Sequence, residues 1–139
     1  MGLANDLTAD LIRKHEGLSL KVYYDTEGIP TVGYGHALQI GSRIPISVAE
    51  RLFWQDYKTA LEDYDKLNLD LSEIRKGVLV NMLFNMGLPR LLGFKKMLAA
   101  LREKDYRKAT SEMINSKWYR QTKSRAIELK EIMRTGEYL

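Results

Sequence analysis

The sequence predicts an α+β fold that is mostly α-helical, with a small antiparallel β-hairpin lobe near the N-terminus and two lobes joined by a long helix. Two observations predict it: strand-like residues at 20–24 and 29–34 flank a turn sequence, and helical periodicity dominates the rest of the chain. We expect a single domain over residues 1–139. Its β lobe lies at roughly 17–46, and its helical lobe at roughly 65–139 together with the N-terminal helix.

Composition narrows the class of protein. With 45% apolar residues the chain can build a core, and with no cysteine it has no disulfide framework. The opening MGLANDLTAD has no apolar run, so we expect neither a signal peptide nor stable membrane insertion. Residues 1–86 have nine Lys and Arg residues and twelve Asp and Glu residues. Residues 87–139 have thirteen Lys and Arg residues and six Asp and Glu residues. The basic second part suggests an anionic polymer as partner, although Lys and Arg often merely solvate helix faces.

The N-terminal elements follow from local signals. Thr8 is a plausible N-cap for a short helix, TADLIRKHE, and Gly17 is placed to end it. The strands follow, and in the DTEG turn between them Gly28 supplies a positive φ. Residues 37–46 read as a loop with a little strand character.

The remaining helices are marked by their caps. Ser47 with Glu50 forms a capping box that opens a long helix through about Tyr64. Ser72 starts the next helix, whose run 78–84 is almost wholly apolar and predicts the buried centre of the helical lobe.

The last part of the chain predicts further helices. Two amphipathic helices, at 94–104 and 106–115, are joined by a short connection. Trp118 and Tyr119 mark a short turn, after which Thr122 caps a final helix ended by Gly136.

Chemistry is concentrated between His15 and His36. Glu16 sits at the helix end and Asp25 at the strand–turn junction, so two carboxylates stand on separate elements. Glycoside hydrolysis needs such a pair, because one acid must stay protonated while the other stays charged. Each also has an ordinary interpretation: Glu16 as a surface residue, and Asp25 as a turn residue that bonds its own backbone. Thr31 could hold a water beside Asp25 or simply be a strand residue.

The segment HEGLSLKVYYDTEGIPTVGYGH resembles the catalytic signature of the phage-type (T4-like) lysozymes, which cleave peptidoglycan. VNMLFNMG at 80–87 and the segment 116–136 extend the resemblance over most of the chain. It implies a lysozyme-like fold, with Glu16 as the general acid and with Asp25 and Thr31 positioning the attacking water. That geometry belongs to inverting enzymes, and no cofactor is needed.

The resemblance also implies roles for supporting residues. Substrate-binding residues are expected at Gly35, Asn81, Phe84 and Asn85, although the family often has Gln where Asn85 stands. Arg125 corresponds to the arginine that pairs with the acid, and His36 is expected to pair with Asp56. An adjacent cation opposes protonation of an acid, so either desolvation by bound sugar must outweigh the cation or the pair must loosen. With only two histidines, a histidine metal site is not expected.

The expected function is that of an endolysin. The bond hydrolysed is the β-1,4 bond between N-acetylmuramic acid and N-acetylglucosamine in peptidoglycan. The resemblance implies a monomer that binds no nucleic acid. It is expected to stay in the host cytoplasm until a holin-like pore releases it to the periplasm and cell wall for lysis.

Other functions stay open on the sequence. A lytic transglycosylase on a related fold needs only one acid, and an inactive cell-wall-binding module needs none. A basic helical nucleic-acid binder would explain the charge of residues 87–139 but not the Glu16 to Thr31 arrangement. The segment between His36 and Ser47 is shorter than in long family members. Met97 and Glu112 also stand where small and amide residues are expected at the cleft.

Overall fold

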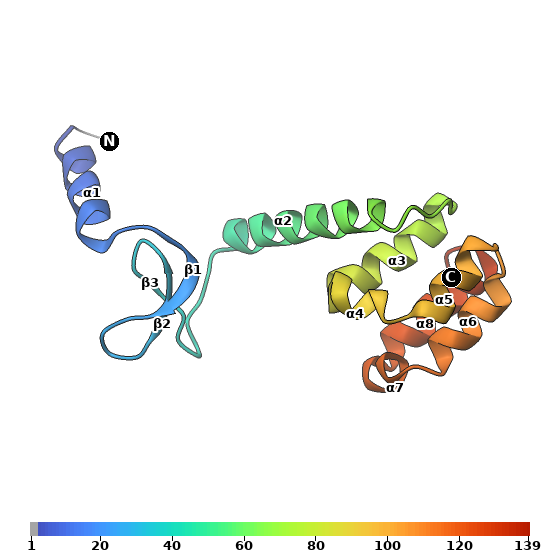
Figure 1. Cartoon of the computed structure of the whole chain (residues 1–139). Coiled ribbons are helices and arrows are strands. Elements are labelled where there is room, and N and C mark those ends of the chain that lie inside the picture. The colour runs from blue at the N-terminus through green and yellow to red at the C-terminus, as the bar shows by residue number, and fades with distance from the viewer. Residues whose placement is uncertain (1–2) are drawn as a thin grey trace. The chain divides into compact units, whose positions relative to one another are not determined.

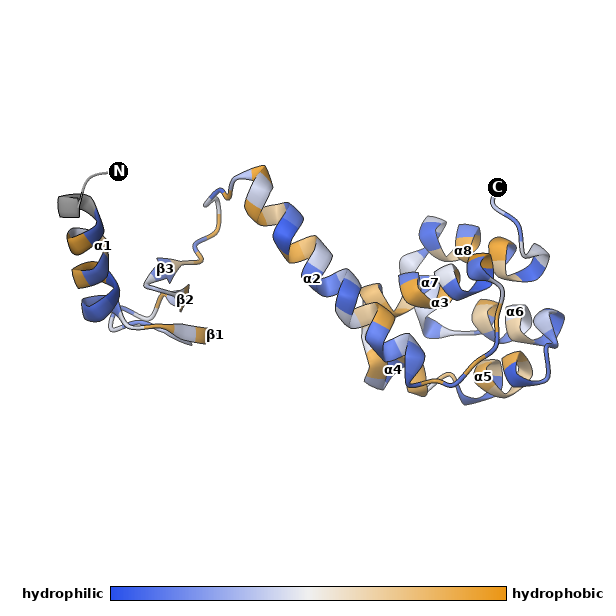
Figure 2. Cartoon of the chain, turned by 90° about the horizontal axis from the view of Figure 1, so that it is seen from above, coloured by the Kyte–Doolittle hydropathy of each residue, from blue (hydrophilic) through white to orange (hydrophobic). Residues whose placement is uncertain are grey.

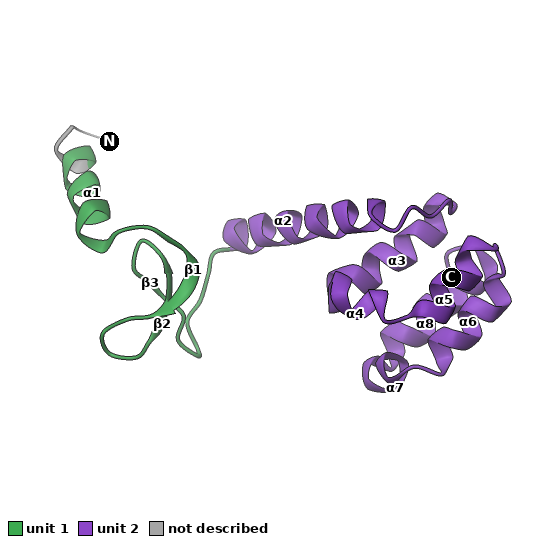
Figure 3. Ribbon diagram, viewed as in Figure 1, with its two compact units in different colours: residues 1–45 green, residues 46–139 purple. Residues whose placement is uncertain are grey.

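A computed structural model describes residues 3–139. In that range the chain forms eight helices and a three-stranded antiparallel sheet near the N-terminus (Figure 1), which confirms the predicted α+β, mostly helical fold. The chain divides into two compact units, unit 1 (Met1–Pro45) and unit 2 (Ile46–Leu139) (Figure 3). The lobe boundaries expected from the sequence, with the N-terminal helix assigned to the helical lobe, stay a prediction.

Unit 1 opens with helix α1 (Leu3–Glu16). Thr8 lies inside this helix, so the prediction that Thr8 caps it is wrong. The residues before Thr8 include Leu and Ala, which favour helix, and they extend it toward the N-terminus. The predicted end is confirmed, because Gly17 has φ 71° and its N–H donates to the carbonyl of Arg13 at 2.8 Å.

The sheet has the order β1 (Ser19–Tyr24), β2 (Pro30–Gly33), β3 (His36–Ala37). Strand β3 was expected only as strand character in a loop. Thr31 on the central strand lies opposite Tyr23 on β1 and Ala37 on β3. The DTEG turn between β1 and β2 is confirmed, since the Asp25 carbonyl accepts from the N–H of Gly28 at 3.0 Å.

Unit 2 is entirely helical among its secondary-structure elements. They are α2 (Ile46–Asp65), α3 (Glu73–Met86), α4 (Leu88–Leu92), α5 (Lys95–Arg102), α6 (Tyr106–Ile114), α7 (Lys117–Thr122) and α8 (Ser124–Thr135). Apolar and polar residues alternate along α2 (Figure 2), as expected of an amphipathic helix. It begins at Ile46, so Ser47 lies inside the helix and the prediction that Ser47 caps it is wrong.

Helix ends in unit 2 test the predicted caps. The Ser72 cap is confirmed, because its Oγ accepts from the N–H of Arg75 at 3.2 Å. Gly136 ends α8 in the left-handed conformation, also as predicted.

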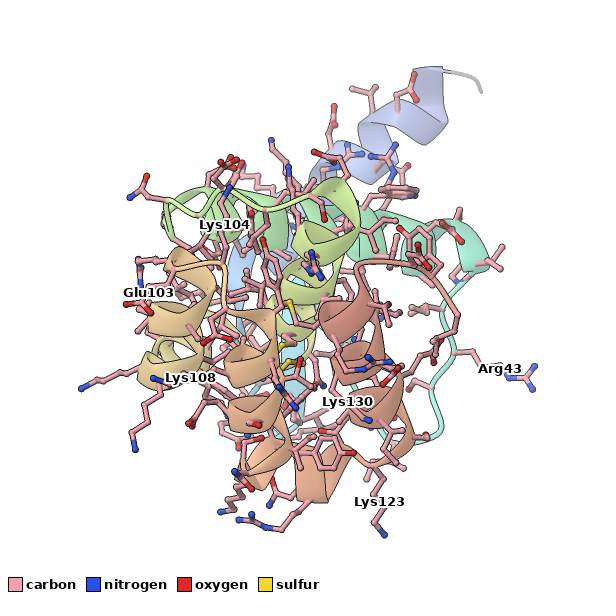
Figure 4. The ribbon with its side chains drawn as sticks, turned by 90° about the vertical axis from the view of Figure 1, so that its right-hand side faces the viewer. Arg43, Glu103, Lys104, Lys108, Lys123 and Lys130 are labelled. Carbon is pink, nitrogen blue, oxygen red and sulfur yellow. The ribbon has the colours of Figure 1, made fainter. Side chains whose placement is uncertain are left out.

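The prediction that Thr122 caps the final helix is wrong. Thr122 is the last residue of α7, a helix in a segment expected to be only a short turn. Lys123 separates α7 from α8 with φ 57° and ψ −114°, and its side chain points away from the helices (Figure 4). A non-glycine residue in this conformation has no signature in local sequence rules.

The hydrophobic core lies within unit 2. Helix α3 packs against α2, α4 and α8, and α6 packs against α5 and α8. The predicted burial of the run 78–84 is confirmed except at Asn81, which is partly exposed, and at Phe84, which is 38% exposed. Trp118, Met82 and Met86 are core residues, as the sequence predicts. In the described part of the chain, no helix is both long enough and apolar enough to cross a membrane.

Candidate active site

Glu16 occupies the last position of α1, where the positive φ of Gly17 turns the chain toward β1. The helix dipole is unfavourable to a carboxylate at this end. The side chain is exposed and borders a cavity of about 300 Å³, which is also lined by Tyr23 of β1. The described residues of unit 1 therefore do not bury the candidate acid.

The Glu16 carboxyl lies against the main chain at Gly35, in the turn between β2 and β3. A Cβ atom added to Gly35 would stand 2.5 Å from Oε2 and 2.9 Å from Cδ of Glu16. Gly35 has φ 75°, a conformation that itself favours glycine. The structure thus brings together two of the residues that the sequence singled out.

Asp25 is anchored to its own turn. Its Oδ1 accepts hydrogen bonds from the N–H groups of Glu27 at 2.8 Å and Ile29 at 2.9 Å. The ordinary turn role is therefore real. Within residues 3–139, no hydrogen bond is made to the second oxygen, Oδ2. Anchoring one oxygen orients the carboxylate and leaves the other available to a ligand or water.

Thr31 is joined to Asp25 through a single residue, Ile29. The Thr31 Oγ1 donates to the carbonyl of Ile29 at 2.8 Å, and the N–H of Ile29 donates to Asp25. Thr31 is 3% exposed. Because the hydroxyl proton is committed to Ile29, the oxygen can act only as an acceptor toward a further partner. Sequence reasoning missed Ile29 because these bonds are made by its main-chain N–H and carbonyl, which any residue except proline has.

Three predicted residues of unit 2 also lie together. Arg125 donates from Nε to Asn81 Oδ1 at 2.8 Å and from its NH2 group to the Asn81 carbonyl at 3.3 Å. With Phe84 they line a cavity of about 260 Å³. The Phe84 ring lies 5.6 Å from that of Phe53, centroid to centroid, in the same lining. An aromatic face beside amide and guanidinium groups suits a sugar ring.

Asn85 makes a hydrogen bond that the sequence did not predict. Its Oδ1 accepts from the indole N–H of Trp118 at 2.9 Å. Because an indole nitrogen can only donate, this bond defines the amide orientation and leaves the NH₂ group for other partners. Asn85 can therefore offer a substrate both amide hydrogens and the remaining lone pair of its Oδ1.

Two predicted pairings join residues of different units. Glu16 and His36 belong to unit 1, and their expected partners Arg125 and Asp56 belong to unit 2. Both pairings stay predictions. His36 lies on β3 opposite Val32, and Asp56 lies in α2, and both are exposed.

Sequence reasoning did not identify a larger cavity of about 540 Å³ in unit 2. Its lining combines apolar side chains with four cations and one carboxylate. The apolar members are Met86, Phe94, Met97 and Trp118, and the charged members are Arg90, Lys95, Lys96, Lys117 and Glu112. The charge excess of residues 87–139 was the signal that could have found it. Such a cavity suits an anionic ligand with some apolar surface.

Comparison with known proteins places this geometry in a family. The family described as phage lysozyme matches residues 13–133. The probable T4-type lysozyme 1 of Dictyostelium discoideum is 31% identical, over 91% of this chain and 93% of its own length. An endolysin of Acyrthosiphon pisum secondary endosymbiont phage 1 is 32% identical, over 78% of this chain and 74% of its own length.

A structural protein of a phage is also similar. The pre-baseplate central spike protein Gp5 of Enterobacteria phage T4 is 34% identical over 92% of this chain, which corresponds to 28% of the spike protein. The family match, over residues 13–133, includes the hairpin that carries Asp25 and Thr31. The resemblance seen in the sequence is confirmed, and the chain belongs to the phage lysozyme family.

Proposed function

We propose that this chain is an endolysin that hydrolyses the β-1,4 bond between N-acetylmuramic acid and N-acetylglucosamine in peptidoglycan. Membership of the phage lysozyme family makes glycoside hydrolysis the expected chemistry. The observation that carries the proposal is the pair of hydrogen bonds through Ile29, which orients Asp25 and Thr31 together. A turn aspartate with a purely local role would not need a threonine hydroxyl oriented by the same residue, Ile29.

In the first half of the reaction, Glu16 gives its proton to the glycosidic oxygen as the bond from that oxygen to the anomeric carbon breaks. An exposed carboxyl is poorly suited to hold a proton near neutral pH. The saccharide itself therefore supplies the desolvation when it covers Glu16. The cavity of about 300 Å³ beside Glu16, with Tyr23 on its wall, is where that saccharide would approach unit 1.

In the second half, a water attacks the anomeric carbon. Since Thr31 Oγ1 can only accept, the water donates one hydrogen to it and the other to Asp25 Oδ2. Both hydrogens are then directed away from the sugar, so a lone pair of the water faces the carbon. The water adds its hydroxyl to that carbon and its proton passes to Asp25. This route inverts the anomeric configuration and forms no covalent enzyme intermediate.

Unit 2 would recognise the polymer. We assign sugar binding to Phe84, Asn81 and Asn85, two of which line the cavity of about 260 Å³. The cation-lined cavity of about 540 Å³ suits the carboxylates of the wall polymer's peptide stems. Both cavities are built from unit 2 alone.

The biological setting follows from the endolysin relatives. We propose that the protein acts as a monomer and accumulates in the host cytoplasm. A separate holin-like pore would then give it access to the wall, and cleavage of peptidoglycan would lyse the cell.

The test is clearing of purified peptidoglycan by the wild-type protein and by Glu16→Gln. Loss of the proton donor should reduce the rate by about 10²–10⁴-fold. Glu27→Gln is the matched control, because it removes an exposed carboxylate from the hairpin that carries Asp25. Circular dichroism shows whether each variant is folded. Unreduced clearing by a folded Glu16→Gln variant would refute the proposal, and mass spectrometry showing anhydro sugar products would indicate a lytic transglycosylase.

A further inference from the structure

We propose that Gly35 is a positioning residue for Glu16, because the absence of a Cβ atom at position 35 leaves room for the Glu16 carboxyl. The inference rests on the proposed function, because it concerns the residue assigned as the acid. It assigns Gly35 a role beyond contact with the sugar, namely that the empty space at its Cα sets the place of the Glu16 carboxyl.

The contact between the two residues is direct. A Cβ on Gly35 would meet three atoms of Glu16, at 2.5 Å from Oε2, 2.9 Å from Cδ and 3.4 Å from Cγ. The separations from Oε2 and Cδ are shorter than real Cβ contacts, so the carboxyl and a side chain at position 35 cannot both occupy these places. The carboxyl rests on a patch of main chain that only glycine exposes.

Little else in the described residues of unit 1 holds the acid. Within residues 3–45 Glu16 makes no side-chain hydrogen bond or ion pair, and it is exposed. Its orientation is therefore set by packing against the turn between β2 and β3. A general acid must stand within hydrogen-bond reach of the leaving oxygen, so this packing bears directly on proton transfer.

A side chain at position 35 would move the acid without unfolding the hairpin. The atoms that it would strike belong to the far end of a flexible side chain, which can rotate to another rotamer at small cost. Displacing a catalytic group by about 1 Å can cost about 10²-fold in rate. The expected defect is thus catalytic rather than structural.

Gly33 offers a matched control in the same segment. It has φ 71°, against 75° for Gly35, so alanine meets a similar backbone penalty at either position. A Cβ on Gly33 would have no heavy atom within 4 Å. The two substitutions therefore differ in whether the new methyl group strikes Glu16.

The experiment compares Gly35→Ala with Gly33→Ala by kcat and KM on soluble peptidoglycan fragments and by thermal unfolding. Both variants should lose similar stability. Gly35→Ala should lower kcat by about 10²-fold with KM within about twofold, whereas Gly33→Ala should keep most of the wild-type kcat. A wild-type kcat in Gly35→Ala, an equal loss of kcat in Gly35→Ala and Gly33→Ala, or an effect on KM alone would each overturn the proposal.

A measurement independent of activity separates this inference from the proposed function. In the wild-type protein, NMR should show a nuclear Overhauser contact between the Glu16 Cγ protons and the Gly35 Cα protons, and Gly33→Ala should retain it. Its absence would overturn the positioning role whatever Glu16 does. Full activity of a folded Glu16→Gln variant would instead reject the proposed function while leaving the contact in place.

Discussion

Asp25 divides two tasks between its two carboxylate oxygens. Oδ1 binds the main chain of its own turn through Glu27 and Ile29, and within residues 3–139 Oδ2 makes no hydrogen bond. An amide side chain would preserve the first task, because its carbonyl oxygen accepts the same two bonds. It would lose the second, because an amide cannot take a proton from water.

The first prediction at this scale separates the two tasks of Asp25. Asp25→Asn should keep the hairpin and lose about 10²–10⁴-fold in peptidoglycan hydrolysis. Asp25→Ala should lose activity as well, and it should cost about 1 kcal/mol more in stability because two turn N–H groups lose their acceptor. Urea unfolding and a clearing assay on both variants measure this. Equal stability of the two variants would contradict the anchoring role, and retained activity in Asp25→Asn would contradict the catalytic one.

At the scale of elements, the junction between α2 and α3 carries a buried titratable group. Tyr64, near the end of α2, is 5% exposed and belongs to the core. Burial raises the pKa of the Tyr64 hydroxyl above its usual value, and the nearby carboxylates of Glu73, Asp65 and Asp70 raise it further. The ionised phenolate would be placed among negative charges with little water, so the folded state favours the neutral form.

This environment predicts a loss of stability in alkali. A tyrosine in the unfolded chain ionises near a pH of about 10, before Tyr64 does so in the folded protein. The contribution of neutral, buried Tyr64 to the stability of the folded state is therefore fully present below that pH. It is lost as the pH rises toward the pKa of Tyr64 in the folded protein. In Tyr64→Phe, stability should fall less steeply between about pH 9 and 11 than in the wild-type protein. Urea unfolding across this range measures it, with Tyr138→Phe as control because Tyr138 is 73% exposed. Identical slopes in Tyr64→Phe and Tyr138→Phe would contradict the assignment.

At the scale of the whole molecule, stability is unevenly distributed between the units. The described apolar residues that are buried all belong to unit 2, from Ala60 to Met133. In unit 1 the strand residues are largely open to solvent, with Leu20 87% exposed, and Thr31 is a buried polar residue at the centre of the sheet. Opening a region with few buried apolar contacts exposes little new surface and so costs little free energy.

Hydrogen exchange should reveal this difference. Amides of β1 and β2 should exchange through openings of lower free energy than amides of α3 and α8, because only the latter require the core to open. Native-state hydrogen exchange followed by mass spectrometry measures this in the full chain. Equal protection of the two units would show that the hairpin unfolds only together with the core.

Local sequence signals were sufficient to predict much of the architecture. The helix start at Ser72, the ends at Gly17 and Gly136, and the turn opened by Asp25 follow from side-chain caps and glycine conformations, which act over a few residues. The same rules failed at Thr8, which lies inside α1, and at Thr122, which ends α7 and does not cap α8. The family could also be read from the signature, because its chemistry requires particular side chains at particular spacings.

The functional arrangement within each unit depended on folding. Ile29 joins Asp25 to Thr31 through main-chain groups that carry no side-chain signature. The contact of Gly35 with Glu16 and the bond from Trp118 to Asn85 join residues 19 and 33 positions apart. Periodicity and capping rules describe neighbours along the chain, whereas these contacts exist only once packing has brought remote segments together. A sequence can therefore name the reactive groups, but their orientation comes from the tertiary contacts that hold them.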